Sequence, residues 1–318
     1  MTTAITLDRV TKRYGTLTAV DGIDLSIPQG SLCGFLGPNG AGKSTTIRMI
    51  MSIIYPDSGS ISVMGGSALD RKDDIGYLPE ERGLYRKMRV GEFLKYIARL
   101  KGMNGKELNR RVKDWLERME LPGVQRKRCQ ELSKGMQQKI QFIASVINDP
   151  ELVILDEPFS GLDPVNARLL GNTVRELHES GRTIIFSTHV LHQAEQICDR
   201  VIMINRGRMV LDGSIEEIRR KFDPRTVRIA ARGGVEALIR KLEKEPLVES
   251  IDRTPDSGTV ELKLSGEADD DEQCIPAAIL QAVGGESDVL SVELRQPTLD
   301  DIFVDLVGSS VEELDGDS

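Results

Sequence analysis

Polar and apolar positions along the first part of the chain follow two periods. They alternate over residues 4–9 and 17–27, as in strands of a half-exposed β-sheet. Residues 31–37 form a short apolar strand that leads into a glycine-rich turn, and residues 45–54 carry a helical apolar stripe. A turn at 55–59 ends this helix, and another strand follows it.

A long helical stretch and three buried strands come next. Between about residues 89 and 148, apolar residues recur every three or four positions. Continuous apolar runs then occupy residues 152–158, 182–189 and 200–207, as in parallel strands that are covered on both faces. Because helices flank these runs, the pattern predicts an α/β fold with a parallel sheet.

The pattern changes near residues 221–224. The segments beyond this point are predicted to run strand, helix, strand, strand, helix, strand, helix, which suits a small split-βαβ domain of the α+β class. They lie at residues 226–232, 235–242, 247–253, 259–265, 276–283, 289–295 and 298–307. We therefore expect a first domain at 1–220 with a helical subdomain at about 89–148, a second domain at 221–310 and an acidic, solvated tail at 311–318.

Composition narrows the class of protein. The 318 residues carry a formal net charge of −8, with 39% hydrophobic and 29% charged residues, so the chain has no general attraction to nucleic acid. It has no run of about 18 apolar residues, so a membrane role would have to come from a partner. The four scattered cysteines, at 33, 129, 198 and 274, favour free thiols in a reducing cytosol over a metal site or disulfides.

Residues 37–45, GPNGAGKST, fit the phosphate-binding pattern G-x-x-x-x-G-K-[ST]. The glycines let backbone N–H groups turn toward phosphate oxygens, and the N-terminus of the following helix favours anions. Lys43 would place a positive charge at the β and γ phosphates, and the Ser44 hydroxyl can ligate Mg²⁺. The predicted ATP-binding residues of this loop are Gly37, Pro38, Asn39, Gly40, Ala41, Gly42, Lys43, Ser44 and Thr45. A chance glycine-rich turn is the alternative, and the strand before and helix after disfavour it.

Two adjacent carboxylates end the strand at 152–158. Neighbouring residues of a strand point to opposite faces, so Asp156 and Glu157 should have different roles. Asp156 is suited to holding Mg²⁺, and Glu157 to accepting a hydrogen bond from an attacking water. An ordinary strand-ending turn at Pro158 would be the favoured interpretation if the phosphate loop were not present.

Four more motifs stand in the order found in ABC-type ATPases, and the chain resembles that family. Residues 132–139, LSKGMQQK, resemble the ABC signature, and residues 156–164, DEPFSGLDP, resemble the Walker B end and the D-loop. Residues 187–189, STH, resemble the switch-histidine motif, and residues 75–80, IGYLPE, resemble the Q-loop. Tyr14 stands where the family stacks an aromatic ring on adenine, although a plain strand residue is the alternative at this position.

The resemblance covers about residues 3–220. It implies a P-loop NTPase ABC cassette, with a parallel-sheet core, an antiparallel β subdomain and a helical subdomain, followed here by the small α+β domain. It implies ATP and Mg²⁺ as ligands, Glu157 as base or positioner of the attacking water, and His189 as a contact of the γ-phosphate. Since the chain has one P-loop and one signature, two complete sites would need a second copy or a homologous cassette, placed head to tail. The residues supplied across that interface would be Ser133, Lys134 and Gly135 of the signature and Asp163 of the D-loop.

Two positions depart from the family pattern. Glu80 stands where the Q-loop usually carries Gln, and its carboxylate would ligate Mg²⁺ either directly or through water. The metal ligands implied are then Ser44, Asp156 and Glu80. The signature reads LSKGM in place of LSGGQ, and Lys134 would either favour the anion or point to solvent.

A resemblance to a narrower group within the family indicates what kind of partner this chain has. Residues 75–88, the signature and residues 297–308 look like those of ATPase subunits of ABC-2-type exporters, including the sodium-export-like and the drug- or antibiotic-export-like groups. This implies a separate polytopic membrane permease that meets residues 81–85, and a peripheral location on the cytoplasmic face of the cell membrane. It implies no nucleic-acid partner.

Two other functions compete with this interpretation. A soluble ABC ATPase that acts on a non-membrane partner such as the ribosome usually carries two cassettes in one chain, whereas this chain carries one. A non-catalytic ATP sensor is disfavoured because Lys43, Asp156, Glu157 and His189 are all present.

Overall fold

The computed structural model describes residues 2–81, 83–222, 226–232, 235–254, 258–265, 275, 277–284 and 288–306. The chain divides into two compact units, Met1–Ile215 and Glu216–Ser318. Among the described residues, no helix combines the length and the apolar character needed to cross a bilayer.

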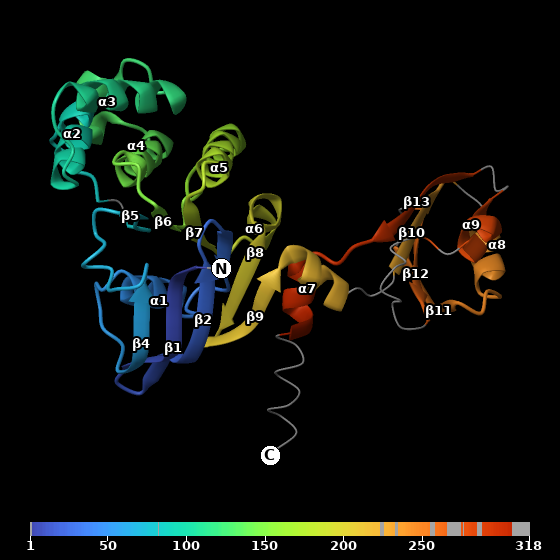
Figure 1. Cartoon of the computed structure of the whole chain (residues 1–318). Helices are drawn as coiled ribbons and strands as arrows, with labels where there is room; N and C mark the ends of the chain where they lie inside the picture. Colours follow the sequence, from blue (N-terminus) through green and yellow to red (C-terminus); the bar gives the residue numbers. More distant parts are fainter. Residues whose placement is uncertain are drawn as a thin grey trace. The chain divides into compact units, whose positions relative to one another are not determined.

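A six-stranded sheet forms the centre of the first unit (Figure 1). Its order is β5-β6-β7-β3-β8-β9, and all neighbouring strands are parallel except β8 and β9. The strands are β3 (Leu32–Leu36), β5 (Ile75–Leu78), β6 (Leu152–Asp156), β7 (Thr183–Thr188), β8 (Arg200–Asn205) and β9 (Arg208–Ser214). Every residue of β3, β6 and β7 is buried, which explains their continuous apolar sequence.

A second, antiparallel sheet of order β2-β1-β4 belongs to the same unit. Its strands are β1 (Thr3–Tyr14), β2 (Leu17–Pro28) and β4 (Ser58–Val63). One apolar core joins the two sheets through helix α1 (Lys43–Ile50), since Ile5 and Ile27 share a cluster with Ile47 and Ile154. The fold expected from the sequence, a parallel core with an antiparallel subdomain, is confirmed.

The remaining helices of this unit lie around the sheets. They are α2 (Val90–Leu100), α3 (Lys106–Arg118), α4 (Lys134–Val146), α5 (Pro164–Glu179) and α6 (Leu191–Ile197), with short 3-10 turns η1 (Val124–Arg126) and η2 (Cys129–Glu131). Helices α2, α3 and α4 gather at the end of the unit away from β1, β2 and β4 (Figure 1). They form the helical subdomain of the cassette.

Three details differ from the sequence pattern. The helix predicted over 45–54 ends at Ile50, because Ser52 takes the left-handed conformation (φ +53°) and the N–H of Ile53 turns back to the Arg48 carbonyl. The pattern also did not predict β5 and β9. Both are edge strands of the sheet. β5 has only 4 residues, too few to show a period, and β9 mixes apolar, charged and small residues.

The second unit contains the predicted succession of elements. It begins within α7 (Ile215–Lys221) and continues through β10 (Thr226–Ala231), α8 (Val235–Leu242), β11 (Val248–Thr254), β12 (Thr259–Leu264), α9 (Ala277–Val283), β13 (Val289–Arg295) and a helix at 299–306. The sheet order is β11-β12-β10-β13, entirely antiparallel. Residues of α8 and α9, such as Leu242 and Ile279, bury one sheet face together with Val227 and Ile229. This unit therefore has a core of its own.

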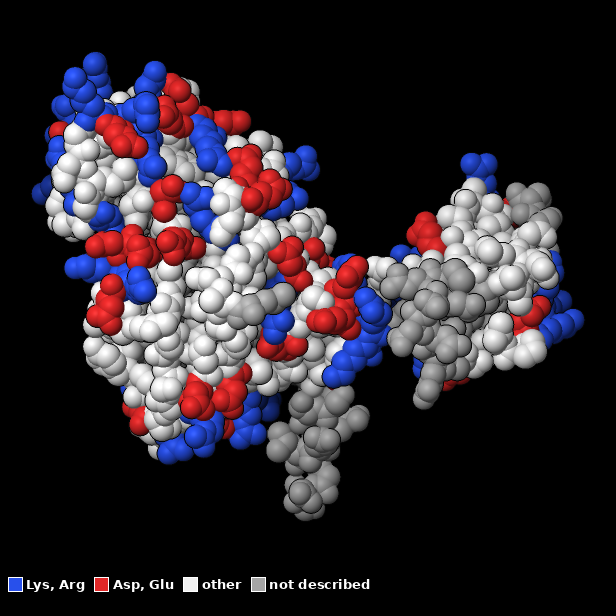
Figure 2. Space-filling view, viewed as in Figure 1, with Lys and Arg blue, Asp and Glu red and all other residues white. Residues whose placement is uncertain are grey.

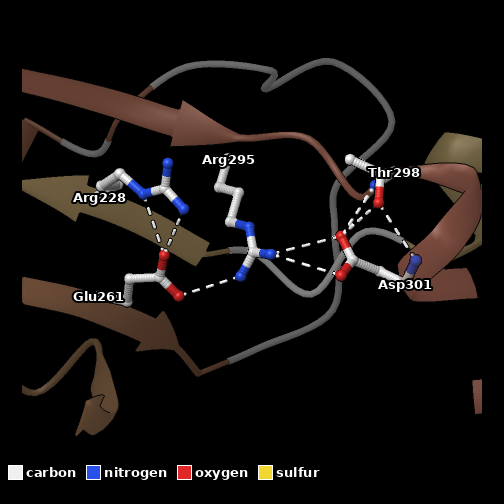
Figure 3. Close-up of polar contacts among 5 residues, drawn as sticks. All are labelled: Arg228, Glu261, Arg295, Thr298 and Asp301. Atoms are coloured by element: carbon white, nitrogen blue, oxygen red, sulfur yellow. Dashed lines mark hydrogen bonds and ion pairs between the residues drawn. The ribbon is translucent and has the colours of Figure 1, made fainter. Parts of the chain in front are cut away.

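The other face of this small sheet carries a chain of ion pairs (Figure 3). Arg228 donates to Glu261 at 3.0 and 2.7 Å, and Arg295 bridges Glu261 at 3.0 Å and Asp301 at 3.4 Å. Thr298 and Asp301 exchange hydrogen bonds at 3.1 Å as a capping box at the start of the last helix. Burial alone would raise the pKa of Asp301, but the Thr298 hydrogen bonds and the Arg295 charge hold that pKa below its usual value. The network ties the last helix to the sheet.

We predict that a chain ending at residue 224 folds and binds Mg·ATP with the affinity of the full chain. All the predicted nucleotide-binding residues lie in the first unit, which has its own core. Circular dichroism and calorimetric titration of the purified fragment would measure both properties. An unfolded or insoluble fragment would show that the second unit completes the core of the first.

Candidate nucleotide site

A cavity of about 700 Å³ lies beside the N-terminus of α1. Such a volume is within the range of small-ligand sites. Most of the predicted ATP-binding residues line it, namely Tyr14, Asn39, Gly40, Gly42, Lys43, Ser44 and Thr45. Gly37, Pro38 and Ala41 belong to the same loop without lining the cavity. The structure therefore brings Tyr14 of β1 next to the phosphate loop, although Tyr14 precedes Leu36, the last residue before the loop, by 22 positions (36 − 14).

Two glycines of the loop are required by its close contacts. Gly37 has φ +146°, and a Cβ there would lie 2.1 Å from the Ile204 carbonyl oxygen. Gly42 has φ +108°, and a Cβ there would lie 2.4 Å from the Ala19 carbonyl oxygen. Any side chain at these positions would collide with backbone, so the strands on either side force the loop into its shape.

Lys43 is held inside the loop. Its side chain is 6% exposed, and its Nζ donates to the carbonyl oxygens of Gly37 at 2.7 Å and Pro38 at 3.1 Å. An ammonium group has three N–H donors, so one remains for a ligand. Burial lowers the pKa of Lys43, while the charges of Glu157 and other carboxylates oppose that shift. The ammonium is thus fixed in place for an anion.

Asp156 at the end of β6 has the properties expected of a metal ligand. It is 1% exposed, and burial raises its pKa, with further contributions from the charges of Glu80 and Glu157. Hydrogen bonds from Ser187 and Ser44 oppose this rise. A buried carboxylate next to a serine hydroxyl and another carboxylate favours a hard cation such as Mg²⁺, because the cation offsets the mutual repulsion. The side chains present therefore fit the ion.

Glu157 and His189 form a hydrogen-bonded pair. His189 Nδ1 lies 2.8 Å from Glu157 Oε1, and Glu157 lines the cavity while its own side chain is 13% exposed. Glu157 also has φ +50°, a strained conformation for a residue with a side chain. The Glu157 N–H is directed at the Ser187 carbonyl (3.2 Å) and hydroxyl (3.3 Å), which fix this turn.

Sequence reasoning missed two residues that position the acidic turn. The Ser187 hydroxyl donates to Asp156 and accepts from the Glu157 N–H, so it orients both carboxylates. Its place in the STH motif could have signalled this role. Gln138 of α4 donates to the Pro158 carbonyl at 3.0 Å and holds the next residue of the turn. Gln138 lies in the predicted signature segment 132–139, but that motif does not indicate the contact with Pro158, which joins segments 20 residues apart.

The signature and D-loop residues lie elsewhere. Ser133 caps α4, its hydroxyl accepts from Met136 N at 3.3 Å, and Ser133, Lys134 and Gly135 are not among the described residues that line the cavity. Asp163 caps α5, and hydrogen bonds from Asn166 hold its pKa below the usual value. Ser133, Lys134 and Asp163 are exposed. They are therefore accessible to a second molecule.

Two further predicted residues lie at the rim of the cavity. Tyr14 at the end of β1 is 50% exposed and lines the cavity. Glu80 follows β5, is exposed, and lines the same cavity as Lys43 and Ser44. Both are placed where a bound nucleotide would reach them.

The loop, the acidic strand end and the histidine define a P-loop nucleotide-hydrolysing cassette. Residues 20–160 match the family described as ABC transporter, and residues 213–307 match the C-terminal domain of the ATP-binding protein DrrA1-3-like family. The chain belongs to the ATP-binding proteins of ABC transporters, with a DrrA-like C-terminal domain. The family recognised from the motifs is confirmed, and this family hydrolyses ATP.

The relatives cover both units. The chain is 42% identical to the uncharacterized ABC transporter ATP-binding protein YhaQ of Bacillus subtilis, over 97% of this chain and 100% of the relative. It is 32% identical to the daunorubicin resistance ATP-binding protein DrrA3 of Streptomyces coeruleorubidus, over 96% of each chain. A solved structure of an ATP-binding subunit of an ABC transporter is similar with TM-score 0.65 and 30% identity, covering 76% of this chain and 100% of the other.

We predict that Lys43→Ala weakens Mg·ATP binding about 100-fold, because it removes a buried charge-assisted hydrogen-bond donor. Calorimetric titration would measure the change. Lys113→Ala is the matched control, because Lys113 is an exposed lysine of α3 with a side chain 70% exposed. Equal affinity of the Lys43→Ala variant and the control would exclude the phosphate-binding role of the loop.

Proposed function

We propose that this chain is the ATP-hydrolysing subunit of an ABC-2-type membrane exporter. The observation that carries the proposal is the division of the motif residues. Lys43 and Glu157 line one cavity, and the buried Asp156 is hydrogen-bonded to Ser44 of that cavity, whereas Ser133 and Asp163 lie outside it on the surface. Because the signature of this chain lies away from its own cavity, the site is completed by the signature of a second cassette. The approach and separation of the two cassettes then drive transport.

Within one chain, the loop binds and orients the nucleotide. The free N–H of Lys43 and the loop backbone bind the β and γ phosphates, and Tyr14 stacks on the adenine. Ser44, Asp156 and Glu80 would hold Mg²⁺, Glu80 either directly or through water. The ion, when bound, neutralises charge on the phosphates.

The acidic turn performs the hydrolytic step. Glu157 accepts a proton or a hydrogen bond from the attacking water, and its position is fixed by Ser187 and by the 2.8 Å contact with His189. His189, which follows the neighbouring strand β7, contacts the γ-phosphate. The strained backbone of Glu157 keeps its carboxylate at the cavity instead of along the strand.

Two cassettes close on the nucleotide head to tail. Ser133, Lys134 and Gly135 at the N-terminus of α4 present a hydroxyl, a cation and N–H groups to the γ-phosphate in the other molecule. Asp163 crosses the interface. Loss of the γ-phosphate after hydrolysis removes the group that joins the two halves, so they separate.

We predict that Glu157→Gln retains ATP binding but hydrolyses ATP on the order of 1,000-fold more slowly, because the amide is no base. The variant should accumulate as a dimer in Mg·ATP, as measured by light scattering after gel filtration. His189→Ala combined with Glu157→Gln should lose little more than Glu157→Gln alone, since the two residues serve one step.

Glu117→Gln is the matched control, because Glu117 is an exposed residue of α3 with a side chain 59% exposed. It should keep the turnover of the unaltered chain. Turnover of Glu157→Gln at that same rate would remove Glu157 from the chemistry.

An aromatic surface on the helical subdomain supports a membrane permease as the partner of this chain. Tyr85 is 53% exposed and packs edge-on against Tyr96, with ring centroids 5.7 Å apart. A cavity of about 210 Å³ beside it is lined by Phe93, Tyr77 and Gln141, and the buried Gln141 Oε1 has no hydrogen-bond donor among the described residues. An apolar groove with an unsatisfied acceptor suits a short helix of a permease on the cytoplasmic face of the membrane.

The relatives and the surface charge fit the same assignment. A relative at 32% identity is a daunorubicin resistance protein, as its name states, which agrees with export of a small molecule. On the face drawn in Figure 2, Lys and Arg lie among Asp and Glu over the first unit, in place of a continuous basic surface for RNA or DNA. This favours the exporter over an ATPase that acts on the ribosome.

We predict that the tagged Glu157→Gln chain, held in Mg·ATP, captures a polytopic membrane protein from detergent-solubilised native membranes. Tyr85→Ala in the same background should reduce that capture about tenfold, since exposed aromatic anchors carry much of the binding energy of an interface. Leu280→Ala, with an exposed apolar side chain on α9 (48% exposed), is the control and should capture normally. Mass spectrometry would identify the captured proteins. Recovery of ribosomal proteins with no membrane protein would favour the soluble ATPase instead.

A further inference from the structure

Arg206 lies at the nucleotide cavity but belongs to none of the motifs. It is the first of two central residues in the tight turn that joins β8 to β9, where Asn205 pairs with Arg208. Arg206 has φ +49° and Gly207 has φ +79°, the left-handed pair that a type I′ turn requires. Asn, Asp or Gly is favoured at the first position, and an arginine there is strained. The turn itself therefore gives no reason for an arginine.

The turn is fastened to the nucleotide-binding loop. The Gly207 N–H donates to the Ala41 carbonyl at 2.8 Å, and the Gly207 carbonyl accepts from Asp21 N at 2.9 Å. One bond reaches the phosphate loop and the other reaches β2. Arg206 is consequently held at a fixed position relative to the loop that would bind the phosphates.

The Arg206 guanidinium has no partner in the part of the chain that the structure describes. It is exposed, and no hydrogen bond or ion pair among the described residues engages it. Arg208, two residues later on the same hairpin, is paired with Asp21 at 2.8 Å. Arg208 therefore stabilises the fold, whereas Arg206 is available to a ligand.

The position of Arg206 indicates which part of the ligand it meets. The cavity wall on the side of β1 and β2 is formed by Tyr14, Leu17 and Thr18, the end assigned above to the base. Among the described residues that line the cavity, the other cation is Lys43 of the phosphate loop. Because the turn of Arg206 is bonded both to Ala41 of the phosphate loop and to Asp21 of β2, this arginine is suited to the ribose and the first phosphate. Its planar set of donors binds phosphate oxygens well.

We propose that Arg206 is a nucleotide-binding residue that contacts the ribose and α-phosphate of the bound nucleotide. The proposal rests on the nucleotide site assigned above and adds a contact to it. The ribose and α-phosphate are common to ATP and ADP. Arg206 therefore strengthens the binding of both nucleotides by the same factor, whereas the signature of a second cassette distinguishes them.

The test compares Arg206→Ala, Arg206→Gly and Arg208→Ala in the full chain. Calorimetric titrations with Mg·ATP and Mg·ADP should show affinities about 5- to 10-fold weaker for both Arg206 variants, as expected for loss of a partly exposed charge-assisted contact. The loss should be equal for the two nucleotides and should appear in KM. Arg208→Ala should bind both nucleotides as the unaltered chain does. Arg206→Gly relieves the strain of the turn, so its weaker binding cannot come from misfolding.

Unchanged affinity of the Arg206 variants, or a loss confined to ATP, would overturn the assignment. The Lys43→Ala variant separates this failure from failure of the site itself. If Lys43→Ala loses binding while the Arg206 variants do not, the nucleotide site stands and only the role of Arg206 is wrong. If the unaltered chain binds neither nucleotide, the site assignment fails as well.

Discussion

The parallel pairing of β6 with β7, and of β7 with β3, is the constraint on which the site depends. Leu36 pairs with Thr188, and Asp156 pairs with Ser187, so all three strands end at the same edge of the sheet. The phosphate loop, the acidic turn and His189 each begin where one of these strands ends. Because parallel strands direct their carboxyl ends to one side, segments more than 100 residues apart in the chain meet there without further adjustment.

The charged side chains at that edge suit the binding of a polyanion together with a cation. Lys43 is buried among carboxylates, and Asp156 has a raised pKa, because burial penalises its charge and Glu80 and Glu157 add repulsion. Mg²⁺ would relieve the repulsion, and phosphate oxygens would occupy the free donor of Lys43. In the proposed site, the same carboxylates that oppose one another in the free chain would become the metal ligands and the base. Glu80 makes the cavity more acidic than the Gln usual in this family would.

Two of the residues with a strained backbone lie at the same place. Glu157 and Arg206 both have left-handed φ values, and each lines the nucleotide cavity. Hydrogen bonds fix both turns, through Ser187 for the first and through the neighbour of Arg206, Gly207, for the second. Strain of this kind persists only where the surroundings hold it, and it is commonest at binding sites. In the C-terminal unit, in contrast, polar contacts join its own sheet to its last helix, as in the series of ion pairs that connects Arg228 with Asp301.

The sequence by itself determined the order of the elements and the chemistry of the motifs. A buried parallel strand must be apolar throughout, and a phosphate loop must have glycines where a Cβ would strike backbone, so both leave local patterns that can be read directly. The βαββαβα order of the second unit followed from periodicity in the same way. The edge strands β5 and β9 left no such pattern, since β5 has only 4 residues and β9 mixes apolar, charged and small residues.

Only the tertiary structure decided which of these residues meet. The contact of Gln138 with Pro158, the double role of Ser187 and the position of Arg206 at the cavity all join distant segments, and no local period encodes them. The exposure of Ser133 and Asp163, outside the cavity of their own chain, could likewise not be read from their spacing. The physical reason is that hydrophobic periodicity specifies which face of an element is buried, whereas the packing of the elements sets which side chains become neighbours.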